Sequence, residues 1–285
     1  MTSIEQHTVP DGPGATLPLR GDTRIPVLGL GVFRAPAGGA TQTAVTAALK
    51  AGYRHIDTAA VYGNEADVGR ALRSGVVDRD QVFLTTKLWN ADHGYERALA
   101  AFERSRRLLD VDHVDLYLVH WPVPALRPET WRAMEHLLES GRAKAIGVSN
   151  YMPRHLEELL RSANHVPAVN QIELSPYNYR SRLDTIELCR ANGIQVEAYS
   201  PLTKGLKLAD PPLVRIAGAH GRSTAQVLIR WALQKGVVVL PKSTRAERIA
   251  ANADVFDFAL TDAEMATLDA LDENLATGWD PTTAP

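Results

Sequence analysis

Eight short apolar runs, most of them rich in β-branched residues, recur along the 285-residue chain and are separated by amphipathic segments. The runs are Val27–Val32, Arg54–Asp57, Val82–Thr86, Val114–Val119, Ala145–Val148, Ala168–Ile172, Ile194–Tyr199 and Val237–Leu240. Strands that alternate with helices indicate parallel βαβ units, and near-continuous apolar strands indicate a sheet buried on both faces. Eight such units in a chain of this length favour an α/β fold, the closed (β/α)8 TIM barrel, over an open sheet.

Helical patterns fill the intervals between these runs. They cover Ala44–Lys50, Glu65–Arg73, Glu96–Leu109, Thr130–Ser140, Pro153–Leu160, Leu183–Ala191 and Ala225–Gln234. Ser223, Thr244 and Thr261 each begin a capping box at a helix start. Ahead of the first run, residues 16–19 and 23–26 flank the turn-forming pair at 21–22 and predict a short β-hairpin. We therefore expect a flexible N-terminal tail over residues 1–15 and a single catalytic barrel domain over residues 16–285.

Composition and charge exclude several classes of protein. Hydrophobic residues make up 45% and charged residues 22%, which is typical of a globular protein. The formal net charge of -2 provides no basic field to hold nucleic acid. No apolar stretch approaches the roughly 18 residues of a membrane span, and residues 1–10 lack the pattern of a signal peptide. The single cysteine, Cys189, allows no internal disulfide and fits a small core position. We expect a cytoplasmic monomer with neither a nucleic-acid nor a membrane partner.

Polar residues at the carboxyl ends of the expected strands suit the reduction of a carbonyl group. Chemistry in (β/α)8 barrels gathers at those ends. Tyr62 can supply the proton, but an ordinary tyrosine has a pKa of about 10. The Lys87 ammonium beside it favours the phenolate and is expected to lower that pKa, while Asp57 holds the lysine charged. His120 can orient the carbonyl oxygen or share its proton.

Six motifs at these strand ends, in this order, resemble the aldo-keto reductase family. They are His55-Ile-Asp-Thr-Ala with Tyr62-Gly-Asn-Glu, Thr85-Thr-Lys-Leu-Trp, Asp115-Leu-Tyr-Leu-Val-His-Trp-Pro, Ile146-Gly-Val-Ser-Asn, Asn170-Gln-Ile-Glu and Pro241-Lys-Ser-Thr. The likeness runs from about Leu17 to Asp280, and the short loops most resemble the bacterial 2,5-diketo-gluconate reductases. It implies an oxidoreductase that uses NADPH to reduce aldehydes, ketones or α-dicarbonyls to alcohols. It also implies a catalytic tetrad of Asp57, Tyr62, Lys87 and His120, with Tyr62 as the general acid.

The cofactor must bind without a Rossmann fingerprint, because Gly29-Leu-Gly31 is followed by Arg34 where the third glycine is needed. Phosphate sites in such barrels commonly use the loops after strands seven and eight, here residues 200–205 and 242–248. The second loop leads into a helix whose N-terminus can attract an anion. Ala251 stands where the family commonly has an acidic residue near the adenine. Ser175 stands where it commonly has a histidine after the Asn-Gln-x-Glu motif.

The resemblance assigns the cofactor contacts residue by residue. It implies that the adenosine 2′-phosphate is bound by Lys242, Ser243, Thr244, Arg248 and Asn252. The nicotinamide carboxamide is expected to contact Ser149, Asn150 and Gln171, and the nicotinamide ring to stack on Tyr199. The expected cofactor site is completed by Ser200, Pro201 and Leu202.

Aromatic residues follow three of the expected strands and predict the walls of the substrate site. Phe33, Trp89 and Trp121 lie after strands one, three and four. The loop over residues 123–129 is short, and Trp279 could fold over the opening. An aromatic, shallow site suits small, partly apolar carbonyl compounds, with weak binding and poor activity on steroids. The alternative is that these rings only pack the rim of the barrel.

The same residues also bear on two other functions and on a metal site. A non-catalytic, NADPH-binding regulatory barrel needs no acid catalyst, and a Schiff-base lyase using Lys87 leaves Tyr62 and the Pro241-Lys-Ser ending unexplained. The nine histidines include no His-x-x-x-His pair or His-x-His strand ending, so we expect no metal.

Overall fold

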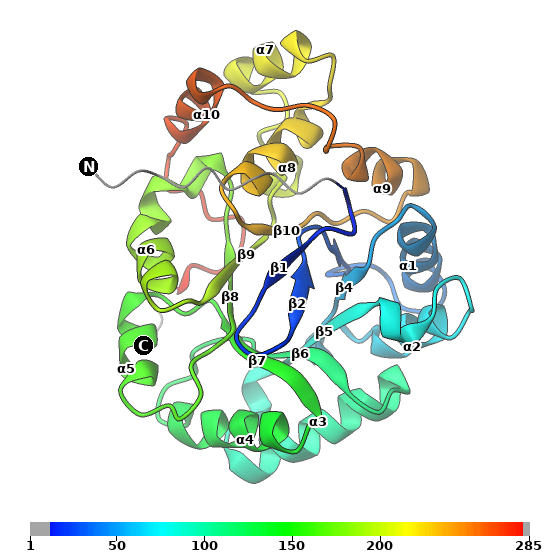
Figure 1. Cartoon of the computed structure of the whole chain (residues 1–285), viewed down its shortest axis with the longest axis vertical. Helices are drawn as coiled ribbons and strands as arrows, with labels where there is room; N and C mark the ends of the chain where they lie inside the picture. The colour runs from blue at the N-terminus through cyan, green and yellow to red at the C-terminus, as the bar shows by residue number, and fades with distance from the viewer. Residues whose placement is uncertain (1–11, 282–285) are drawn as a thin grey trace.

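A computed structural model describes residues 12–281 and contains an eight-stranded parallel sheet that curls into a barrel (Figure 1). The strands are β3 (Leu30–Gly31), β4 (His55–Asp57), β5 (Phe83–Leu88), β6 (Val114–Val119), β7 (Ala143–Ser149), β8 (Val169–Glu173), β9 (Gln195–Tyr199) and β10 (Val238–Leu240). They pair in chain order from β3 to β10. The barrel closes where the Gly29 amide donates to the Val239 carbonyl at 3.0 Å and the Val239 amide donates to Val27 at 2.9 Å. The (β/α)8 barrel expected from the sequence is confirmed.

The first strand of the barrel is shorter than predicted, because its segment pairs first with β10 and then with β4. Leu28 forms an isolated parallel bridge with Val239, and regular pairing with β4 covers only Leu30 and Gly31. Between them, a Cβ atom on Gly29 would lie 2.6 Å from Leu240 Cδ2 and 2.8 Å from the His55 ring. Only glycine allows the backbone to pass this close to both side chains.

A ring of helices surrounds the sheet (Figure 1). The helices that follow successive strands are α1 (Ala40–Lys50), α2 (Glu65–Leu72), α3 (Tyr95–Leu109), α4 (Arg127–Glu139), α5 (Pro153–Leu160), α6 (Leu183–Ala191), α8 (Thr224–Gln234) and α9 (Ala246–Ala253). Two further helices, α7 (Pro211–Ala219) and α10 (Asp262–Asp269), pack against each other outside the ring. Short 3-10 turns are η1 (Ala60–Tyr62), η2 (Arg79–Gln81), η3 (Asn90–Asp92), η4 (Pro176–Asn178), η5 (Arg180–Arg182) and η6 (Thr203–Gly205).

Two of the three expected helix caps are confirmed. The side chains of Ser223 and Thr261 accept hydrogen bonds from the backbone three residues on and complete capping boxes. The prediction for Thr244 was wrong, because α9 begins at Ala246. Its N-cap residue is Arg245, which makes no side-chain cap. Ser243 Oγ instead accepts from the Arg245 amide at 3.1 Å, so the turn before α9 is organised one residue earlier than the motif indicated.

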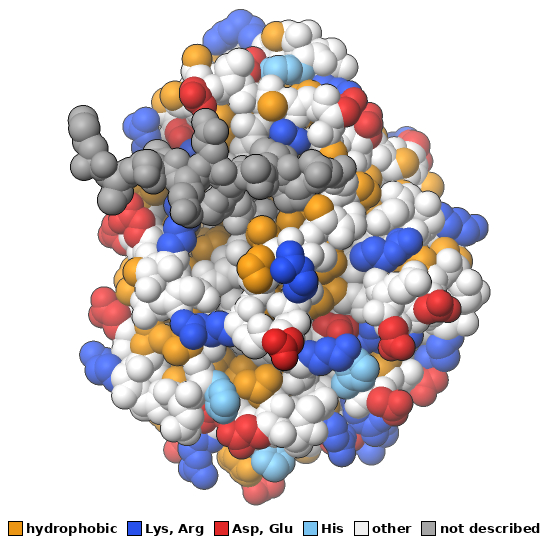
Figure 2. Space-filling view, viewed as in Figure 1, with side chains coloured by type: hydrophobic (Ala, Val, Ile, Leu, Met, Phe, Trp, Pro, Cys, Tyr) orange, Lys and Arg blue, Asp and Glu red, His pale blue; other side chains and the backbone are white. Residues whose placement is uncertain are grey.

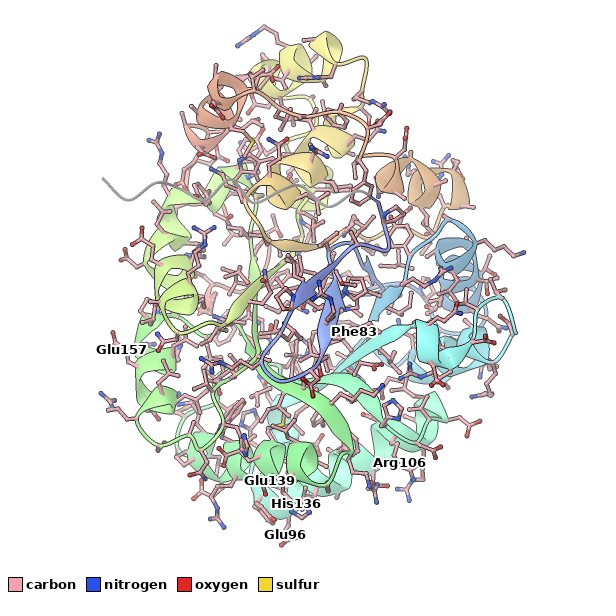
Figure 3. The ribbon with its side chains drawn as sticks, in the orientation of Figure 1. Phe83, Glu96, Arg106, His136, Glu139 and Glu157 are labelled. Atoms are coloured by element: carbon pink, nitrogen blue, oxygen red, sulfur yellow. The ribbon has the colours of Figure 1, made fainter. Side chains whose placement is uncertain are left out.

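The predicted hairpin is confirmed as β1 (Thr16–Pro18) paired antiparallel with β2 (Arg24–Pro26). It lies across one end of the barrel, opposite the end where the strands finish (Figure 1). Leu19 and Ile25 of this hairpin pack inside the barrel with Phe83, which is labelled beside the hairpin in Figure 3. Acidic and basic side chains are interspersed over this face (Figure 2). The expected tail falls mostly on residues 1–11, outside the described residues.

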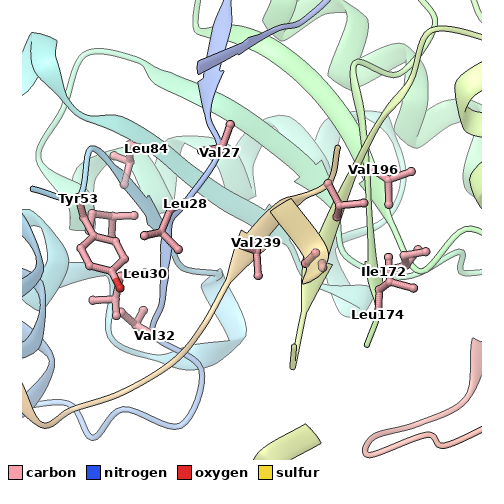
Figure 4. Packing of buried hydrophobic residues seen from close by; sticks show 14 of the residues in the cluster. Val27, Leu28, Leu30, Val32, Tyr53, Leu84, Ile172, Leu174, Val196 and Val239 are labelled. Carbon is pink, nitrogen blue, oxygen red and sulfur yellow. The ribbon is translucent and has the colours of Figure 1, made fainter. Parts of the chain in front are cut away.

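The larger apolar core lies between the sheet and the helices (Figure 4). Leu30 and Val32 pack there near Tyr53, and Cys189 is buried in the same core, as its helical pattern predicted. Within residues 12–281, no helix is both long enough and apolar enough to span a membrane.

Candidate active site

The candidate active site centres on Lys87, which is fully buried at the carboxyl end of β5. Its Nζ donates to both carboxylate oxygens of Asp57, each at 2.7 Å, and to the Thr58 carbonyl at 2.9 Å. The Tyr62 hydroxyl lies 3.5 Å from the same Nζ. The structure therefore brings three of the predicted tetrad residues together, with the lysine between an acid and a phenol.

Local structure explains how Tyr62 reaches this position. Asp57 ends β4, and η1 carries Tyr62 back over the barrel. The turn ends at Gly63, whose φ of +68° is left-handed and favours glycine. Asn64 then fixes the loop, because its Oδ1 accepts from Thr58 Oγ1 at 2.8 Å and its Nδ2 donates to the Val32 carbonyl at 3.0 Å. Asn64 belongs to the sequence motif, yet its bracing role appears only in the structure.

The pKa of Tyr62 is raised above its ordinary value, so the expectation of a lowered pKa was wrong. Burial of the phenol raises the pKa, and the neighbouring Lys87 charge lowers it by less. Burial lowers the pKa of Lys87, but pairing with Asp57 and proximity to Tyr62 raise it above the usual value overall. At neutral pH the pair is therefore a protonated phenol beside a charged ammonium.

His120 follows β6 directly and completes the tetrad as a neutral imidazole. Its ring lies 5.7 Å from the Tyr62 ring, centroid to centroid, in an edge-on arrangement. Burial, and secondly the Lys87 charge, hold the pKa of His120 well below its ordinary value. Its backbone carbonyl accepts from Asn150 Nδ2 at 3.0 Å, which ties the end of β6 to the end of β7. A neutral imidazole can donate one hydrogen bond to a substrate oxygen without carrying a charge.

The residues assigned to the nicotinamide carboxamide form one hydrogen-bonded group. Tyr199 donates its hydroxyl to Asn150 Oδ1 at 2.8 Å, and Asn150 Nδ2 donates to Ser149 Oγ at 3.1 Å. Ser149 Oγ donates to the Gln171 carbonyl at 2.9 Å, and Gln171 Nε2 reaches Asp57 Oδ2 at 2.9 Å. The side-chain amide oxygens of this group retain acceptor capacity, which fits an amide ligand.

The residues assigned to the 2′-phosphate lie in the turn before α9 and within that helix. Lys242 and Arg248 are exposed, and neither forms an ion pair with a described carboxylate. Ser243 and Thr244 are half-buried, and Asn252 is buried. Two unpaired cations flanking a helix N-terminus suit a phosphate.

The other cofactor loop, after β9, begins with Ser200 at a left-handed φ of +50° and continues through Pro201 and Leu202. Lys204 of this loop donates from Nζ to the Thr277 carbonyl, so the loop is tied to the C-terminal segment.

The family model for the aldo/keto reductase family matches residues 39–273. The chain belongs to this family. Its relatives include an "Uncharacterized oxidoreductase YtbE" of Bacillus subtilis, 48% identical, in a match that covers 92% of this chain and 95% of that protein. A glyoxal reductase of the same organism is 46% identical, in a match that covers 93% of this chain and 96% of that protein. Among solved structures, a Bombyx mori aldo-keto reductase in complex with NADP is 35% identical with a TM-score of 0.85, covering 92% and 94%.

In this aldo/keto reductase the predicted aromatic residues contact the tetrad rings. The Phe33 ring lies 5.0 Å from Tyr62, and Trp89 lies 5.3 Å from His120, centroid to centroid. Trp121 stacks on His120 at 6.4 Å. The three rings therefore contact Tyr62 or His120, and their role as walls of the substrate site stays a prediction.

Trp279, whose position the sequence left open, lies 4.5 Å from Trp121 and remains 54% exposed. The backbone amide of Thr277 holds this segment by donating to Glu173 Oε1 at 2.9 Å.

Sequence reasoning missed a second buried layer of polar groups beneath the tetrad. Glu197 of β9 and His55 of β4 are both fully buried, and Glu197 Oε2 accepts from Gln171 Nε2 at 2.6 Å. The signal was a charged residue in the middle of the apolar run 194–199. Across residues 12–281, no cluster of three or more histidine, cysteine or acidic side chains is placed to hold a metal ion.

Proposed function

We propose that the chain reduces small aldehydes and α-dicarbonyls to alcohols with NADPH, using Tyr62 as the general acid. The observation that carries this proposal is the Tyr62 hydroxyl, 3.5 Å from a fully buried Lys87 that is paired with Asp57. Membership of the aldo/keto reductase family and the NADP complex of the Bombyx mori relative support the choice of cofactor.

The side chains at the site fit this cofactor. Ser149, Asn150 and Gln171 would hold the carboxamide, because their amide oxygens retain acceptor capacity after the internal hydrogen bonds are made. The Tyr199 ring, fixed through its hydroxyl, would lie against the nicotinamide. Lys242 and Arg248 would bind the 2′-phosphate and so favour NADPH over NADH. When bound, the cofactor supplies a hydride to the carbonyl carbon.

The tetrad residues supply the proton and the charge stabilisation. Tyr62 is protonated at neutral pH and donates its phenolic proton to the carbonyl oxygen. The phenolate left behind is stabilised by the Lys87 ammonium, which Asp57 keeps charged and in place. Neutral His120 donates a hydrogen bond to the same oxygen and orients it. Solvent returns a proton to Tyr62 after the product leaves.

Substrate size follows from the rings around Tyr62 and His120. Phe33, Trp89 and Trp121 would form an apolar wall of the substrate site, and Trp279, which contacts Trp121, would extend it. The glyoxal reductase among the relatives supports small dicarbonyl substrates. We expect broad activity, weak substrate binding and poor activity on steroids. We also infer that the chain forms a single barrel domain. We infer that the protein is monomeric and cytoplasmic and has no nucleic-acid partner.

The alternatives are less well supported. A regulatory barrel has no use for a complete tetrad buried beside an aromatic wall. A Schiff-base lyase needs a neutral amine, but Asp57 and its neighbours raise the pKa of Lys87 and keep it charged.

A substrate panel with the purified chain tests the proposal. NADPH consumption is followed with glyoxal, methylglyoxal, benzaldehyde and a steroid ketone, and product alcohols are identified by mass spectrometry. We expect turnover of the aldehydes and dicarbonyls and little with the steroid. Absence of NADPH oxidation with every compound would contradict the proposal, and trapping of a substrate on Lys87 by borohydride would favour the lyase.

A further inference from the structure

Glu197 lies inside the barrel one layer below the tetrad, where one amide group joins two carboxyl groups. Gln171 Nε2 donates to Glu197 Oε2 at 2.6 Å and to Asp57 Oδ2 at 2.9 Å. Glu197 is fully buried, and Gln171 is 2% exposed. The other carboxyl oxygen of Glu197, Oε1, lies 3.6 Å from His55 Nε2 and has no hydrogen-bond partner among the described residues, so Gln171 is the one hydrogen-bond partner of this carboxyl group there.

This geometry fixes which way the Gln171 amide faces. A glutamine amide has two N–H donors on Nε2 and one acceptor oxygen. Both donors are used on the two carboxyl groups, and a flipped amide would instead set its oxygen against the Asp57 carboxylate, which already accepts from Lys87. Oε1 therefore remains as the acceptor, and it has no hydrogen-bond partner among residues 12–281.

We propose that Glu197 is a positioning residue of the active site: through Gln171 it presents an acceptor oxygen to the carboxamide of the cofactor, and its own proton sets the charge beside the tetrad. This inference rests on the proposed function, because the carboxamide belongs to NADPH. Glu197 acts through Gln171 and touches neither the cofactor nor the reacting carbonyl.

The charges that face Glu197 all come from the barrel interior. They are Asp57 and His55 of β4, Lys87 of β5 and, further out, Tyr62 of η1, while Val238, its partner on β10, is apolar. Burial and the Asp57 charge raise the pKa of Glu197 to about 8. His55 stays neutral across this range, because burial lowers its pKa to about 3.

Glu197 is therefore protonated at neutral pH, which leaves Lys87 paired with one carboxylate alone. Above pH 8 Glu197 ionises and brings a second negative charge to the cluster. That charge raises the pKa of Tyr62 further and makes it a weaker acid. Carbonyl reduction should then decline as the pH rises through about 8, well before Tyr62 itself titrates.

Two variants separate the two roles of Glu197. Glu197→Gln keeps an acceptor for Gln171 and cannot ionise, whereas Glu197→Leu fills the space and offers no acceptor. We expect Glu197→Gln to retain NADPH affinity within a few-fold and to lose the alkaline decline of kcat/KM. Glu197→Leu leaves a buried N–H unpaired and should weaken NADPH binding by about 10-fold in a fluorescence titration. Glu135→Gln is the matched control, since Glu135 is buried outside the barrel interior and bonds to the backbone amides of Asn164 and His165.

Infrared spectra of the cofactor-free protein provide a readout independent of activity. A protonated carboxyl band should disappear between pH 7 and pH 9 in the unmodified chain and in Glu135→Gln, and should be absent from Glu197→Gln. A pH profile of Glu197→Gln that matches the unmodified chain, a missing infrared band, or normal NADPH binding by Glu197→Leu would overturn the inference. If Glu197→Leu fails to fold, the infrared titration and the Glu197→Gln profile still decide. A chain inactive at every pH instead refutes the proposed function, while the NADPH titration and the infrared band still test the position of Glu197.

Discussion

The two ends of the barrel interior are built from the same strands but have opposite character. At the hairpin end, Leu19, Ile25, Phe83 and Leu116 form a closed apolar plug. At the carboxyl end, buried charges and amides surround Lys87.

The change takes place within single strands. Side chains two residues apart share a face of a strand, and along β5 that face changes from Phe83 through Thr85 to Lys87. Along β8 it changes from Val169 through Gln171 to Glu173. The plug keeps water from the lower end of the barrel, so the polar groups above it act in a desolvated environment.

This difference explains why the polar end tolerates so little change. Lys87, Asp57 and Gln171 are each held by two or more hydrogen bonds, so the removal of one partner leaves another buried group unpaired. At the apolar end a substitution removes contacts but exposes no charge. Mutations at the two ends should therefore separate activity from stability.

The largest expected effect is at Tyr62. Tyr62→Phe removes the proton donor but keeps the ring that contacts Phe33 and His120. We expect kcat/KM for an aldehyde to fall by about 10²–10⁴-fold, while NADPH affinity and thermal stability stay close to those of the unmodified chain. Steady-state kinetics with a parallel NADPH titration measures both quantities. Turnover within a few-fold of normal would show that another group donates the proton.

Substitutions in the hairpin are expected to lower stability and to leave activity unchanged. Ile25 is fully buried in the plug, so Ile25→Ala should lower the free energy of unfolding by about 3 kcal/mol and Ile25→Val by about 1 kcal/mol. Below the unfolding transition, kcat/KM should remain near normal in both variants. Urea unfolding and kinetics on the same samples test this separation. A loss of activity in folded Ile25→Ala would mean that the plug also shapes the catalytic end.

A smaller effect is expected at the cofactor loop, where Arg248 is exposed and unpaired among the described carboxylates. Arg248→Ala should weaken NADPH binding by about 10- to 100-fold and leave NADH binding nearly unchanged. Arg245→Ala is the matched control, because Arg245 is also exposed but is paired with Glu247. Equal losses for both cofactors, or an equal loss in the control, would remove the assignment of the 2′-phosphate to Arg248.

The smallest effect concerns a buried histidine outside the barrel interior. Burial lowers the pKa of His93 from its ordinary value of 6.5 to about 4. Between pH 6.5 and pH 4, the unfolded chain therefore binds a proton at this residue that the folded chain does not. Stability from this residue is therefore lost as the pH falls. Relative to His93→Gln, the free energy of unfolding should drop by about 1 kcal/mol from pH 6.5 to pH 5.5. Denaturant titrations of both proteins at the two pH values test this, and a constant difference would contradict it.

Much of the fold and the tetrad could be predicted because their signals are local. The apolar runs mark each strand, and Asp57, Lys87 and His120 stand at or near strand ends, where barrel geometry forces them together. The direction of the pKa shift at Tyr62 could not be predicted, because it depends on how burial compares with one charge. Helix α7 was missed although Asp210 and two prolines precede and begin it.

Other features depend on contacts between segments distant in sequence. Glu197 meets Asp57 only through Gln171, which lies 114 residues from Asp57 in the chain. Trp279 contacts Trp121 in a segment that Glu173 and Lys204 hold through Thr277. Neither spacing nor periodicity contains such information, since both contacts join segments that only the folded chain brings together.

The transfer of a hydride is the central claim, and isotope labelling tests it most directly. NADPH carrying deuterium at the nicotinamide C4, prepared separately in each stereochemical form, is incubated with the purified chain and methylglyoxal. One of the two forms should yield an alcohol with deuterium on the former carbonyl carbon, and Tyr62→Phe should form that labelled product at least about 100-fold more slowly. Alcohol that lacks deuterium with both forms of the cofactor, or no alcohol at all, would contradict the account.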